Sequence, residues 1–594
     1  MMERPTLVIV GGGTAGWMSA ALLSHITKGR LADIVLVESE DIGTIGVGEA
    51  TIPAIKRFNR LLEVNERDFV RQTRATFKLG IEFVGWGRRD SRYIPPFGAI
   101  GEPLGRTGFE HYLARRRLSG ITESFEDYSL NCMAAKHNRF RTPPRDQSLL
   151  STLSYAYHFD AGLYAAYLRR RAEASGVRRV EGKIKHVAQH PDSGFVTTLT
   201  LESGQEITGD FFIDCSGLSG LLIEKTLNSG YEDWSHWLPC DRAAFVPSER
   251  TEPLTPYTRS TADQAGWRWR IPLQHRTGNG HVFASGFISN ETAAENLLKG
   301  LDGKALADPK FLRFTTGRRK LAWNRNVVAI GLSAGFLEPL ESTSIHLIQS
   351  GLVKFLDLWP GRDIDPLLAE QYNRAMANQY ETIRDFIILH YKATTRDDTP
   401  FWTYCRNMAV PDSLTWKMDH FRASSRIVLT PGELFQPTSW LAVLLGQDIV
   451  PKAYDPLAGI ADDDQVAAHF DRLRDAGMVL AVCTNKLESL ARALIEGLNL
   501  DGYFTVITGG DTFPVRKPDP AHLTGTVDLA GGDIRRTVMV GDSLNDLRVA
   551  VNAGVPSIGV PFGYSDVPIQ TLDPTVLITH YDQLTPDLVL SLVR

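Results

Sequence analysis

The segment TLVIVGGGTAGW, residues 6–17, constrains the fold of this chain more than any other stretch. Its first five residues are aliphatic or β-branched and predict a short buried strand, and GGGTAG predicts a tight turn. An apolar-faced helix is expected over 17–25, and DIVLVE (33–38) predicts the next strand. This order indicates a βαβ unit, so we expect an α/β fold built on a doubly wound, mainly parallel sheet.

The turn carries a specific glycine spacing. Gly11, Gly13 and Gly16 form G-x-G-x-x-G directly between strand and helix, and Glu38 ends the next strand. Such glycines permit a tight turn and close backbone approach, the helix N-terminus attracts a pyrophosphate, and the carboxylate can bind ribose hydroxyls. We interpret the unit as a dinucleotide site that includes Thr14 and Ala15, and the alternative is a purely structural turn.

Only one such fingerprint occurs, so one bound dinucleotide is expected. FAD is favoured over NAD because GVGEATIP (46–53) follows, with Gly48 and Ala50 in a glycine-flanked strap suited to lie against a flavin ring. An ordinary glycine loop is the alternative. If only FAD binds, reducing power has to arrive from a separate flavin reductase.

Composition excludes several classes of protein. A formal net charge of −5 argues against a nucleic-acid-binding protein. The five cysteines lie far apart without a CxxC pair, which argues against a disulfide framework or a zinc knuckle and fits a reducing cytoplasm. The apolar opening lacks a basic n-region and is interrupted by glycines, so neither a signal peptide nor a membrane span is expected. We expect a soluble, cytoplasmic monomer or homodimer.

At 594 residues the chain exceeds one compact core. Alternating segments predict antiparallel strands at 180–189 and 195–201, whereas 210–217 and 326–331 are typical of buried strands. A second strand–helix pattern begins near residue 477, and we place a boundary near 462–476. The expected domains are a dinucleotide-binding domain with an inserted antiparallel sheet and substrate-contacting insertions (1–365), a helical substrate region (366–465) and a second α/β segment (473–594).

The segment GWRWRIP (266–272) contains W-x-W-x-I-P. Together with GGGTAG, GVGEATIP, the lysine of TFKLGI and the run FLEPLESTS, it resembles the flavin-dependent halogenases of the tryptophan halogenase type over about residues 5–470. A tryptophan pair at alternate strand positions would by itself indicate core packing. The resemblance implies a Rossmann-like FAD domain that uses FADH2, oxygen and chloride or bromide.

The resemblance also implies the reacting groups. In the family, hypohalous acid travels through a tunnel to a lysine beside an aromatic substrate, and the motif identifies that lysine as Lys78. An ammonium can hydrogen-bond the oxidant, whereas a desolvated amine can form a haloamine; the sequence leaves both open, and a solvated helix face is the non-catalytic alternative. Glu341 matches the carboxylate that accepts the arene proton, with Glu338 as the competing choice and helix capping as the alternative for either.

Other site residues follow from the same resemblance. The halide site would be formed by the backbone N–H groups of Thr343 and Ser344 at a helix start, although many members have glycine at the second position. Leu332 and Ile345 would border the flavin, and Val187 its adenine end. Phe97 would contact the substrate, but RYIPPFG (92–98) lacks the histidine of tryptophan-specific members, and the segment 426–440 lacks their Trp-rich clamp. We therefore expect an indole or related electron-rich arene as the substrate.

The chain from about Leu473 onward resembles haloacid-dehalogenase-like phosphatases, in particular the phosphoglycolate phosphatase group. Thr484 and Asn485 match its phosphate-holding position, Lys517 its charge-neutralising lysine, and Asp542 with Asp546 its magnesium loop. Such enzymes need a nucleophilic aspartate in D-x-D-G-T after the first strand, and no such motif occurs in this chain. The nearest candidate, IADDDQV (460–466), lacks the preceding strand.

We therefore expect a partial, inactive α/β fragment with a vestigial magnesium loop, no metal, and unpaired edges on the strands that flank the missing one. The alternative functions are a flavin monooxygenase that hydroxylates an aromatic substrate, a bifunctional protein with phosphoglycolate phosphatase activity, and a non-catalytic flavoprotein that binds a partner through its final segment.

Overall fold

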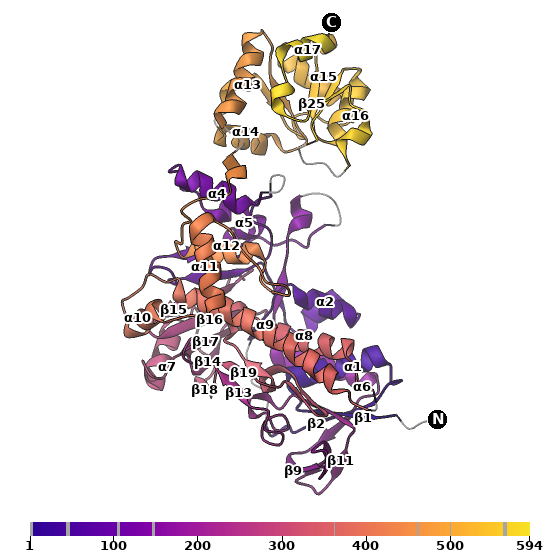
Figure 1. The fold of residues 1–594 in the computed structure, drawn as a ribbon, viewed down its shortest axis with the longest axis vertical. Coiled ribbons are helices and arrows are strands. Elements are labelled where there is room, and N and C mark those ends of the chain that lie inside the picture. Colours follow the sequence, from indigo (N-terminus) through magenta and orange to yellow (C-terminus); the bar gives the residue numbers. More distant parts are fainter. Residues whose placement is uncertain are drawn as a thin grey trace. The chain divides into compact units, whose positions relative to one another are not determined.

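The computed structural model describes residues 4–42, 48–103, 107–144, 149–361, 363–459, 463–498, 500–561 and 567–593, without the side chains of 463–466. The start of GVGEATIP and residues 460–462 of IADDDQV lie outside the described residues. The chain divides into two compact units (Figure 1). Unit 1 extends to Pro103 and from Gly108 to Asp455, and unit 2 comprises Leu104–Thr107 and Pro456–Arg594. The boundary expected at 462–476 falls within the first α-helix of unit 2.

Unit 1 contains the βαβ unit that the glycine segment predicts. β1 and β2 pair in parallel with Leu7 opposite Ile34, and both strands are buried runs of aliphatic residues. They belong to a six-stranded sheet in which only β20 runs antiparallel to its neighbour. In spatial order its strands are β20 (Trp323–Asn324), β21 (Val327–Ala329), β12 (Phe211–Asp214), β1 (Thr6–Val10), β2 (Asp33–Glu38) and β8 (Arg178–Glu181).

A seven-stranded sheet carries the W-x-W-x-I-P segment on β16. All its neighbouring strands are antiparallel except β15 and β5, which confirms the antiparallel insertion. Its order is β18 (Lys310–Arg313), β14 (Arg242–Ser248), β17 (Thr277–Phe283), β16 (Gly266–Pro272), β15 (Thr258–Asp263), β5 (Ile81–Val84) and β6 (Arg92–Tyr93).

Three smaller sheets complete the strands of unit 1. They are β3 (Gly48–Ala50), β7 (Ala156–Asp160) and β4 (Thr76–Lys78); β11 (Glu206–Thr208), β10 (Val196–Leu201) and β9 (Ile184–Gln189); and β13 (Tyr231–Asp233), β19 (Gly317–Arg319) and β22 (Gly335–Phe336). The first of these places the strap strand β3 and the lysine strand β4 on either side of β7.

Several helices of unit 1 begin at residues whose side chains bond to the first free N–H groups of the helix. Asp160 caps α6 and Asp365 caps α9, whose first residue is Pro366. The α-helices of unit 1 are α1 (Thr14–Thr27), α2 (Ala54–Leu61), α3 (Glu66–Gln72), α4 (Phe109–Leu118), α5 (Leu130–Lys136), α6 (Ala161–Ala174), α7 (Asn290–Lys299), α8 (Ser344–Asp357), α9 (Pro366–Lys392), α10 (Pro400–Asn407), α11 (Asp412–Ser424) and α12 (Pro437–Gly446). Its 3-10 helices are η1 (Phe125–Tyr128), η2 (Leu149–Thr152), η3 (Gly217–Ser219), η4 (Gly331–Ser333) and η5 (Pro339–Glu341).

Helix α1 packs against α6 and α8. The buried apolar residues of unit 1 form one large cluster and a small satellite made of Ala50, Ile271 and Leu273. Among the described residues no helix is long and apolar enough to cross a membrane.

Unit 2 holds two separate parallel sheets. From the sequence we expected a single parallel sheet from which one strand is missing. β23 (Ala481–Cys483) pairs with β24 (Val506–Thr508), and β25 (Met539–Gly541) pairs with β26 (Ser557–Gly559), which pairs with β27 (Val576–Leu577). No described strand joins β23 to β25. The helices are η6 (Pro456–Gly459), α13 (Asp463–Asp475), α14 (Glu488–Gly497), η7 (Asp501–Tyr503), α15 (Pro520–Leu529), η8 (Ile534–Arg536), α16 (Leu544–Ala553), η9 (Ile569–Leu572), η10 (Tyr581–Gln583) and α17 (Pro586–Leu592).

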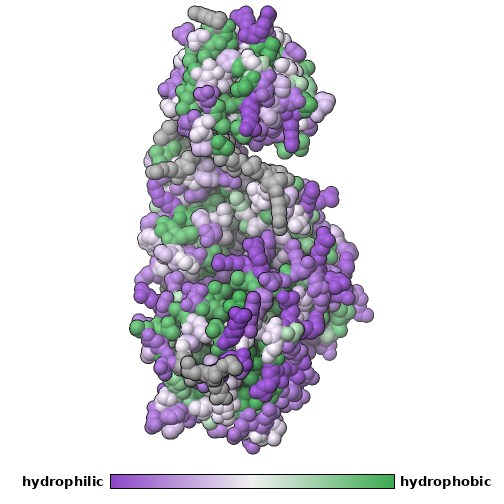
Figure 2. All heavy atoms as spheres, turned by 90° about the vertical axis from the view of Figure 1, so that its right-hand side faces the viewer, coloured by the Kyte–Doolittle hydropathy of each residue, from purple (hydrophilic) through white to green (hydrophobic). Residues whose placement is uncertain are grey.

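Unit 2 leaves apolar side chains at its surface. Leu487, Leu490, Leu494 and Leu498 recur along and just beyond α14, and each is about half exposed. Figure 2 shows apolar residues in green among the polar ones on the surface of this unit. An apolar stripe at helical spacing normally packs against a neighbour, and no described element of unit 2 buries this stripe of α14.

Candidate active site

The glycine turn lies at the carboxyl end of β1, between β2 and β12 in the sheet order. Gly11 has a φ of 109°, and a Cβ there would lie 2.3 Å from the carbonyl oxygen of Cys215. A Cβ at Gly16 would lie 1.8 Å from the carbonyl oxygen of Gly11, so neither position accommodates a side chain. A Cβ at Gly13 would meet nothing within 4 Å. The turn therefore packs tightly on the strand while Gly13 faces open space.

The N-terminus of α1 and the carboxylate of Glu38 face this turn. Gly13 is the N-cap of α1 and supplies no side-chain hydrogen bond, which suits the backbone N–H groups of Thr14 and Ala15 to an anion. A Cβ at Gly12 would lie 1.3 Å from Oε2 of Glu38, so the carboxylate lies directly over the turn. These residues fit the pyrophosphate and ribose of a dinucleotide.

The predicted flavin neighbours fall into two groups. Leu332 lies in η4 beside the turn, because a Cβ at Gly331 would be 2.9 Å from Cβ of Ala15. Ile345 is buried in the first turn of α8, which contacts η4. Val187 pairs with Leu199 in the sheet of β9, β10 and β11, which is separate from the sheets of the turn and of Lys78.

The strap packs against the W-x-W-x-I-P strand. A Cβ at Gly48 would lie 3.3 Å from Cγ2 of Ile271, and Ala50 shares a small apolar cluster with Ile271 and Leu273. Trp269 of this motif strand lies over Gly280 of β17, and a Cβ at Gly280 would be 2.1 Å from the tryptophan ring. The motif strand thus supports the strap from one side.

Lys78 is the last residue of β4 and is fully buried, so the solvated helix face considered from the sequence is wrong. Its Nζ donates to the carbonyl oxygen of Thr51 at 3.0 Å and to Oγ of Ser342 at 2.8 Å. Ser342 has a φ of 58°, an uncommon backbone conformation for a residue with a side chain. Burial lowers the pKa of Lys78 to about 7, opposed by the negative charge of Glu341.

Aromatic and imidazole groups surround this lysine. The ring centroid of Phe97 lies 5.1 Å from Nζ, within cation–π range. Fully buried His158 bonds through its two ring nitrogens to the hydroxyls of Thr76 (3.0 Å) and Thr258 (2.9 Å). Burial and then the charge of Lys78 lower the pKa of His158 far below its usual value, so this ring stays neutral.

The two candidate carboxylates have different partners. Oε1 of buried Glu341 lies 2.7 Å from Nε2 of His390. Oε2 of Glu338 accepts hydrogen bonds from Nε1 of Trp267 (2.9 Å) and from the hydroxyl of Tyr391 (2.6 Å). Burial raises the pKa of Glu338 to about 7, although both hydrogen bonds lower it. Glu341 is the carboxylate whose charge acts on Lys78, and Glu338 holds the first motif tryptophan.

The start of α8 carries an unsatisfied polar group. Thr343 is its N-cap and is fully buried, yet its side chain makes no capping hydrogen bond. Its Oγ1 has no hydrogen-bond partner among the described residues. Ser344 begins the helix, so the N-terminal end of the helix dipole points into the same place. A buried, unpartnered hydroxyl at a helix start suits an anion.

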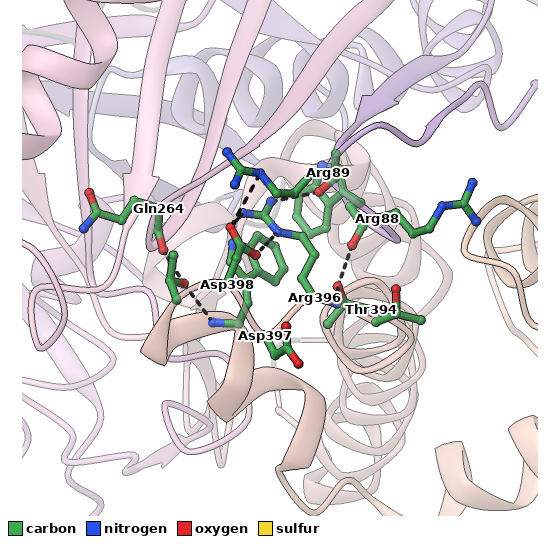
Figure 3. Close-up of polar contacts among 12 residues, drawn as sticks. Arg88, Arg89, Gln264, Thr394, Arg396, Asp397 and Asp398 are labelled. Atoms are coloured by element: carbon green, nitrogen blue, oxygen red, sulfur yellow. Dashed lines mark hydrogen bonds and ion pairs between the residues drawn. The ribbon is translucent and has the colours of Figure 1, made fainter.

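A polar cluster fixes the end of α9 next to this site (Figure 3). Arg396 donates to the carbonyl oxygen of Gly85 at 2.9 Å and binds both carboxylate oxygens of Asp398 at 2.8 and 3.0 Å. The hydroxyl of Thr394 donates to the carbonyl oxygen of Trp86 at 2.7 Å. His390 lies on the last turn of α9, so this cluster holds it in place.

The residues predicted to bind phosphate in unit 2 lie close together, but several of their polar groups are already bonded to one another. Nζ of Lys517 donates to the carbonyl oxygen of Cys483 at 2.6 Å and also binds Oδ1 of Asp546. Oδ2 of Asp546 accepts from the backbone N–H of Ser543, and the backbone N–H of Asp546 donates to the Ser543 hydroxyl, which completes a capping box on α16; the same hydroxyl also donates to Oδ2. Asn485 donates its amide to the carbonyl oxygen of Lys517 at 2.9 Å. Asp542 is half-buried at the end of β25, and Thr484 follows β23.

A model of the family described as tryptophan halogenase matches residues 6–463. The chain belongs to the tryptophan halogenase family. It is therefore a flavin-dependent halogenase, and FAD, a halide and oxygen are the cofactor and cosubstrates that the family implies.

Relatives of this halogenase include solved structures. Xcc4156, a flavin-dependent halogenase from Xanthomonas campestris, is 47% identical with a TM-score of 0.75 and covers 78% of this chain and 93% of its own. BrvH, a flavin-dependent halogenase from Brevundimonas sp. BAL3, is 44% identical with a TM-score of 0.75, over 79% and 94%. Tryptophan 6-halogenase SttH from Streptomyces toxytricini is 34% identical over 505 residues, which are 80% of this chain and 95% of SttH.

The final part of the halogenase chain has its own relatives. A haloacid dehalogenase-like hydrolase model matches residues 460–560. A phosphoglycolate phosphatase from Agrobacterium fabrum is 57% identical over 123 residues, which are 21% of this chain and 53% of the phosphatase. The chain thus spans about half the length of that phosphatase.

Sequence reasoning missed three groups that bond to the halogenase residues it identified. These are Thr51 and Ser342, which bind Lys78, and His390, which lies beside Glu341. The signal for His390 was a single histidine in the otherwise apolar helical run FIILHY (386–391). Such a histidine is more often a core residue, and only the packing of α9 against η5 distinguishes the two cases.

Proposed function

We propose that the chain uses FADH2, oxygen and chloride or bromide to make hypohalous acid, with which it halogenates an indole or a related electron-rich arene. The observation that carries this proposal is Lys78, a fully buried amine near the ring of Phe97 to which no carboxylate of the described residues is directly bonded. A soluble protein rarely buries a lysine without an ion pair, and it does so chiefly at functional sites.

The flavin would be held by Gly11, Gly13, Gly16 and Glu38 at its pyrophosphate and ribose, with Thr14 and Ala15 beside them. Gly48, Ala50, Leu332 and Ile345 would border its ring, and Val187 its adenine end. When bound, the reduced flavin supplies the oxidised halogen species from oxygen and halide. No NAD fingerprint accompanies the FAD site, so a separate flavin reductase would deliver the reducing equivalents.

Lys78 would hold the oxidant at the substrate. In its ammonium form it donates a hydrogen bond to hypohalous acid, and in its amine form it offers a lone pair to the halogen. Its lowered pKa makes both forms accessible near neutral pH. Thr51 and Ser342 direct Nζ by accepting two of its hydrogen bonds.

Glu341 would accept the proton that the arene loses. Electrophilic attack leaves a cationic ring, and a buried carboxylate both stabilises that cation and removes its proton. Thr343 and Ser344 would bind the halide, supported by the unpartnered hydroxyl at the helix start. The side chain of Ser344, where many family members have glycine, would narrow this site.

The proposed substrate is an arene without an amino-acid backbone. RYIPPFG contains no histidine before Phe97, and Trp440 packs against Phe386 with Lys417 over its ring. The chain is also more similar to Xcc4156 and BrvH, whose names specify no amino acid, than to tryptophan 6-halogenase SttH.

Unit 2 would hydrolyse no phosphate ester. The D-x-D-G-T motif is absent, Lys517 is bonded to Asp546, and the described strands form two separate sheets. Asp542 and Asp546 would thus be a vestigial magnesium loop. We further propose a cytoplasmic monomer or homodimer, consistent with the spread cysteines and the net charge of −5.

The decisive experiment supplies purified protein with FAD, a flavin reductase, NADH, oxygen and bromide or chloride, and offers a panel of indoles and phenols. We expect products with the isotope pattern of bromine or chlorine. A product heavier by one oxygen would identify a hydroxylase instead, and no halogenated product from any substrate would refute the proposal. Phosphoglycolate with magnesium tests unit 2, where phosphate release would refute its inactivity.

A further inference from the structure

His390 contacts Glu341 in a buried part of the site. The histidine is fully buried on the last turn of α9, and Glu341 is buried at the end of η5. Nε2 of His390 lies 2.7 Å from Oε1 of Glu341, although the ring N–H direction departs from the line between them. Neither atom has another hydrogen-bond partner among the described residues.

The other ring nitrogen settles the tautomer. Nδ1 of His390 lies 2.9 Å from the carbonyl oxygen of Phe386, which only accepts, so Nδ1 carries a hydrogen. In the neutral ring, Nε2 is then a lone pair. An unprotonated ring nitrogen and an ionised carboxylate oxygen only 2.7 Å apart would repel each other, because both atoms are electron-rich, so one proton belongs to the Glu341–His390 pair, on either partner.

The surroundings of His390 leave few competing charges. Phe83 and Trp86 pack on the ring at 4.8 and 6.0 Å, and Phe386 at 5.2 Å. The carbonyl of His390 accepts the amide of Gln447, which also bonds to the hydroxyl of Tyr93. Burial raises the pKa of Tyr93 far above its usual value, so this phenol stays protonated. Lys78, on whose pKa the charge of Glu341 acts, is a charged group that remains beside the pair.

We propose that His390 is a positioning residue that holds one proton in common with Glu341 and so prepares this carboxyl group to take the proton released by the arene. This inference rests on the proposed function. The ring C–H bond breaks, its electron pair restores the aromatic ring, and the proton goes to Glu341. The pair then holds two protons, one on the carboxyl group and one on Nε2, with the positive charge on the imidazolium.

Two variants separate this role from packing. His390→Gln keeps a polar side chain without the imidazole ring, and His281→Gln is the matched control. His281 is equally buried, and its Nδ1 bonds to the carbonyl oxygen of Ala293 at 3.0 Å. Within the described part of the chain its Nε2 has no hydrogen-bond partner, and so no carboxylate bonds to it. We expect His390→Gln to lower kcat by about 100-fold with unchanged FAD affinity, and His281→Gln to leave kcat unchanged.

An isotope effect shows which step is slowed. With ring-deuterated indole, His390→Gln should develop a kinetic isotope effect on kcat that the unmodified protein and His281→Gln lack, because loss of the ring proton becomes rate-limiting. A smaller fraction of folded protein would lower kcat without such an effect. Glu341→Gln combined with His390→Gln should be no slower than Glu341→Gln alone. The inference would be overturned if His390→Gln showed no kinetic isotope effect on kcat. It would also be overturned if the losses of kcat in Glu341→Gln and His390→Gln added in the double variant.

If no halogenated product forms, the proposed function is refuted, but the inference about His390 is not. A measurement on the resting protein, without turnover, then still tests that inference. With ¹⁵N-labelled histidine, the ring signals that disappear in His390→Gln belong to His390. Glu341→Gln should shift the Nε2 signal of His390 and leave that of His281 unchanged. An unmoved His390 signal would show that no proton is held in common.

Discussion

The two units differ in how they treat polar groups at the ends of their strands. In unit 1, Lys78 bonds only to uncharged oxygens, α1 has no side-chain cap, and the hydroxyl of Thr343 has no partner among the described residues. In unit 2, Lys517 bonds to Asp546, and Asp546 completes the capping box of α16. Unsatisfied buried groups mark a place prepared for a ligand, whereas satisfied ones stabilise a fold. The contrast between the two buried lysines supports the proposal that the chemistry takes place in unit 1.

The largest expected effect separates the two buried lysines. Lys78→Ala should lower the rate of halogenation by about 1000-fold or more, because it removes an essential reacting group, while flavin oxidation continues. Lys517→Ala should leave product formation unchanged. Mass spectrometry of the arene product, with oxygen uptake measured in parallel, checks both variants. If Lys78→Ala formed as much halogenated product as the unmodified protein, Lys78 would have no chemical role that Lys517 lacks.

Replacing the two buried lysines should change the stability of their units in opposite directions. Lys517→Met leaves the Asp546 carboxylate buried without its cation and should destabilise unit 2 by about 3–5 kcal/mol. Lys78→Met removes an amine whose burial lowers its pKa to about 7, and should stabilise unit 1 by about 1–3 kcal/mol.

These changes can be measured one unit at a time. All 11 tryptophans lie before residue 456, so tryptophan fluorescence during urea unfolding reports on unit 1. Hydrogen exchange of β25 and α16 reports on unit 2. Equal destabilisation by both methionine variants would show that Lys78 is structural, as Lys517 is.

Local sterics made part of this site predictable from sequence. Gly11 adopts a φ of 109° that favours glycine, and Gly16 lies against the carbonyl oxygen of Gly11, so both requirements have a local origin. Glu38 follows from the length of the βαβ unit. The absence of D-x-D-G-T likewise predicted that β23 and β25 would lack a strand between them.

The burial of Lys78 had no local signal, because a lysine in a three-residue strand is indistinguishable from a surface lysine until the surrounding sheets are placed. Only the resemblance to a family identified it. The contact between Glu341 and His390 depends on how α9 packs against η5, and no periodicity in either segment encodes that distance. Long-range packing is therefore what the sequence reading lacked.

Two glycines test whether the open turn of unit 1 is a cofactor site. Gly13→Ala adds a methyl group where nothing lies within 4 Å, so it should leave stability unchanged and weaken FAD binding by about tenfold. Gly16→Ala places its methyl group 1.8 Å from the carbonyl oxygen of Gly11 and should lower both stability and FAD affinity. Flavin fluorescence titration and the urea midpoint measure the two effects. Unchanged affinity in Gly13→Ala would place the flavin elsewhere.

The smallest expected effect, a change of a few-fold, concerns the protonation of Lys78 and decides between its two chemical roles. Because burial lowers its pKa to about 7, the ammonium predominates below that pH and the amine above it. The single-turnover halogenation rate should therefore bend near pH 7. A rate that falls as the pH rises assigns the ammonium, and a rate that rises assigns the amine. Glu338 also has a pKa raised to about 7, so Glu338→Gln is the control and should keep the bend. A flat profile would show that Lys78 does not titrate during turnover, and the lysine of unit 1 would then resemble that of unit 2 in this respect.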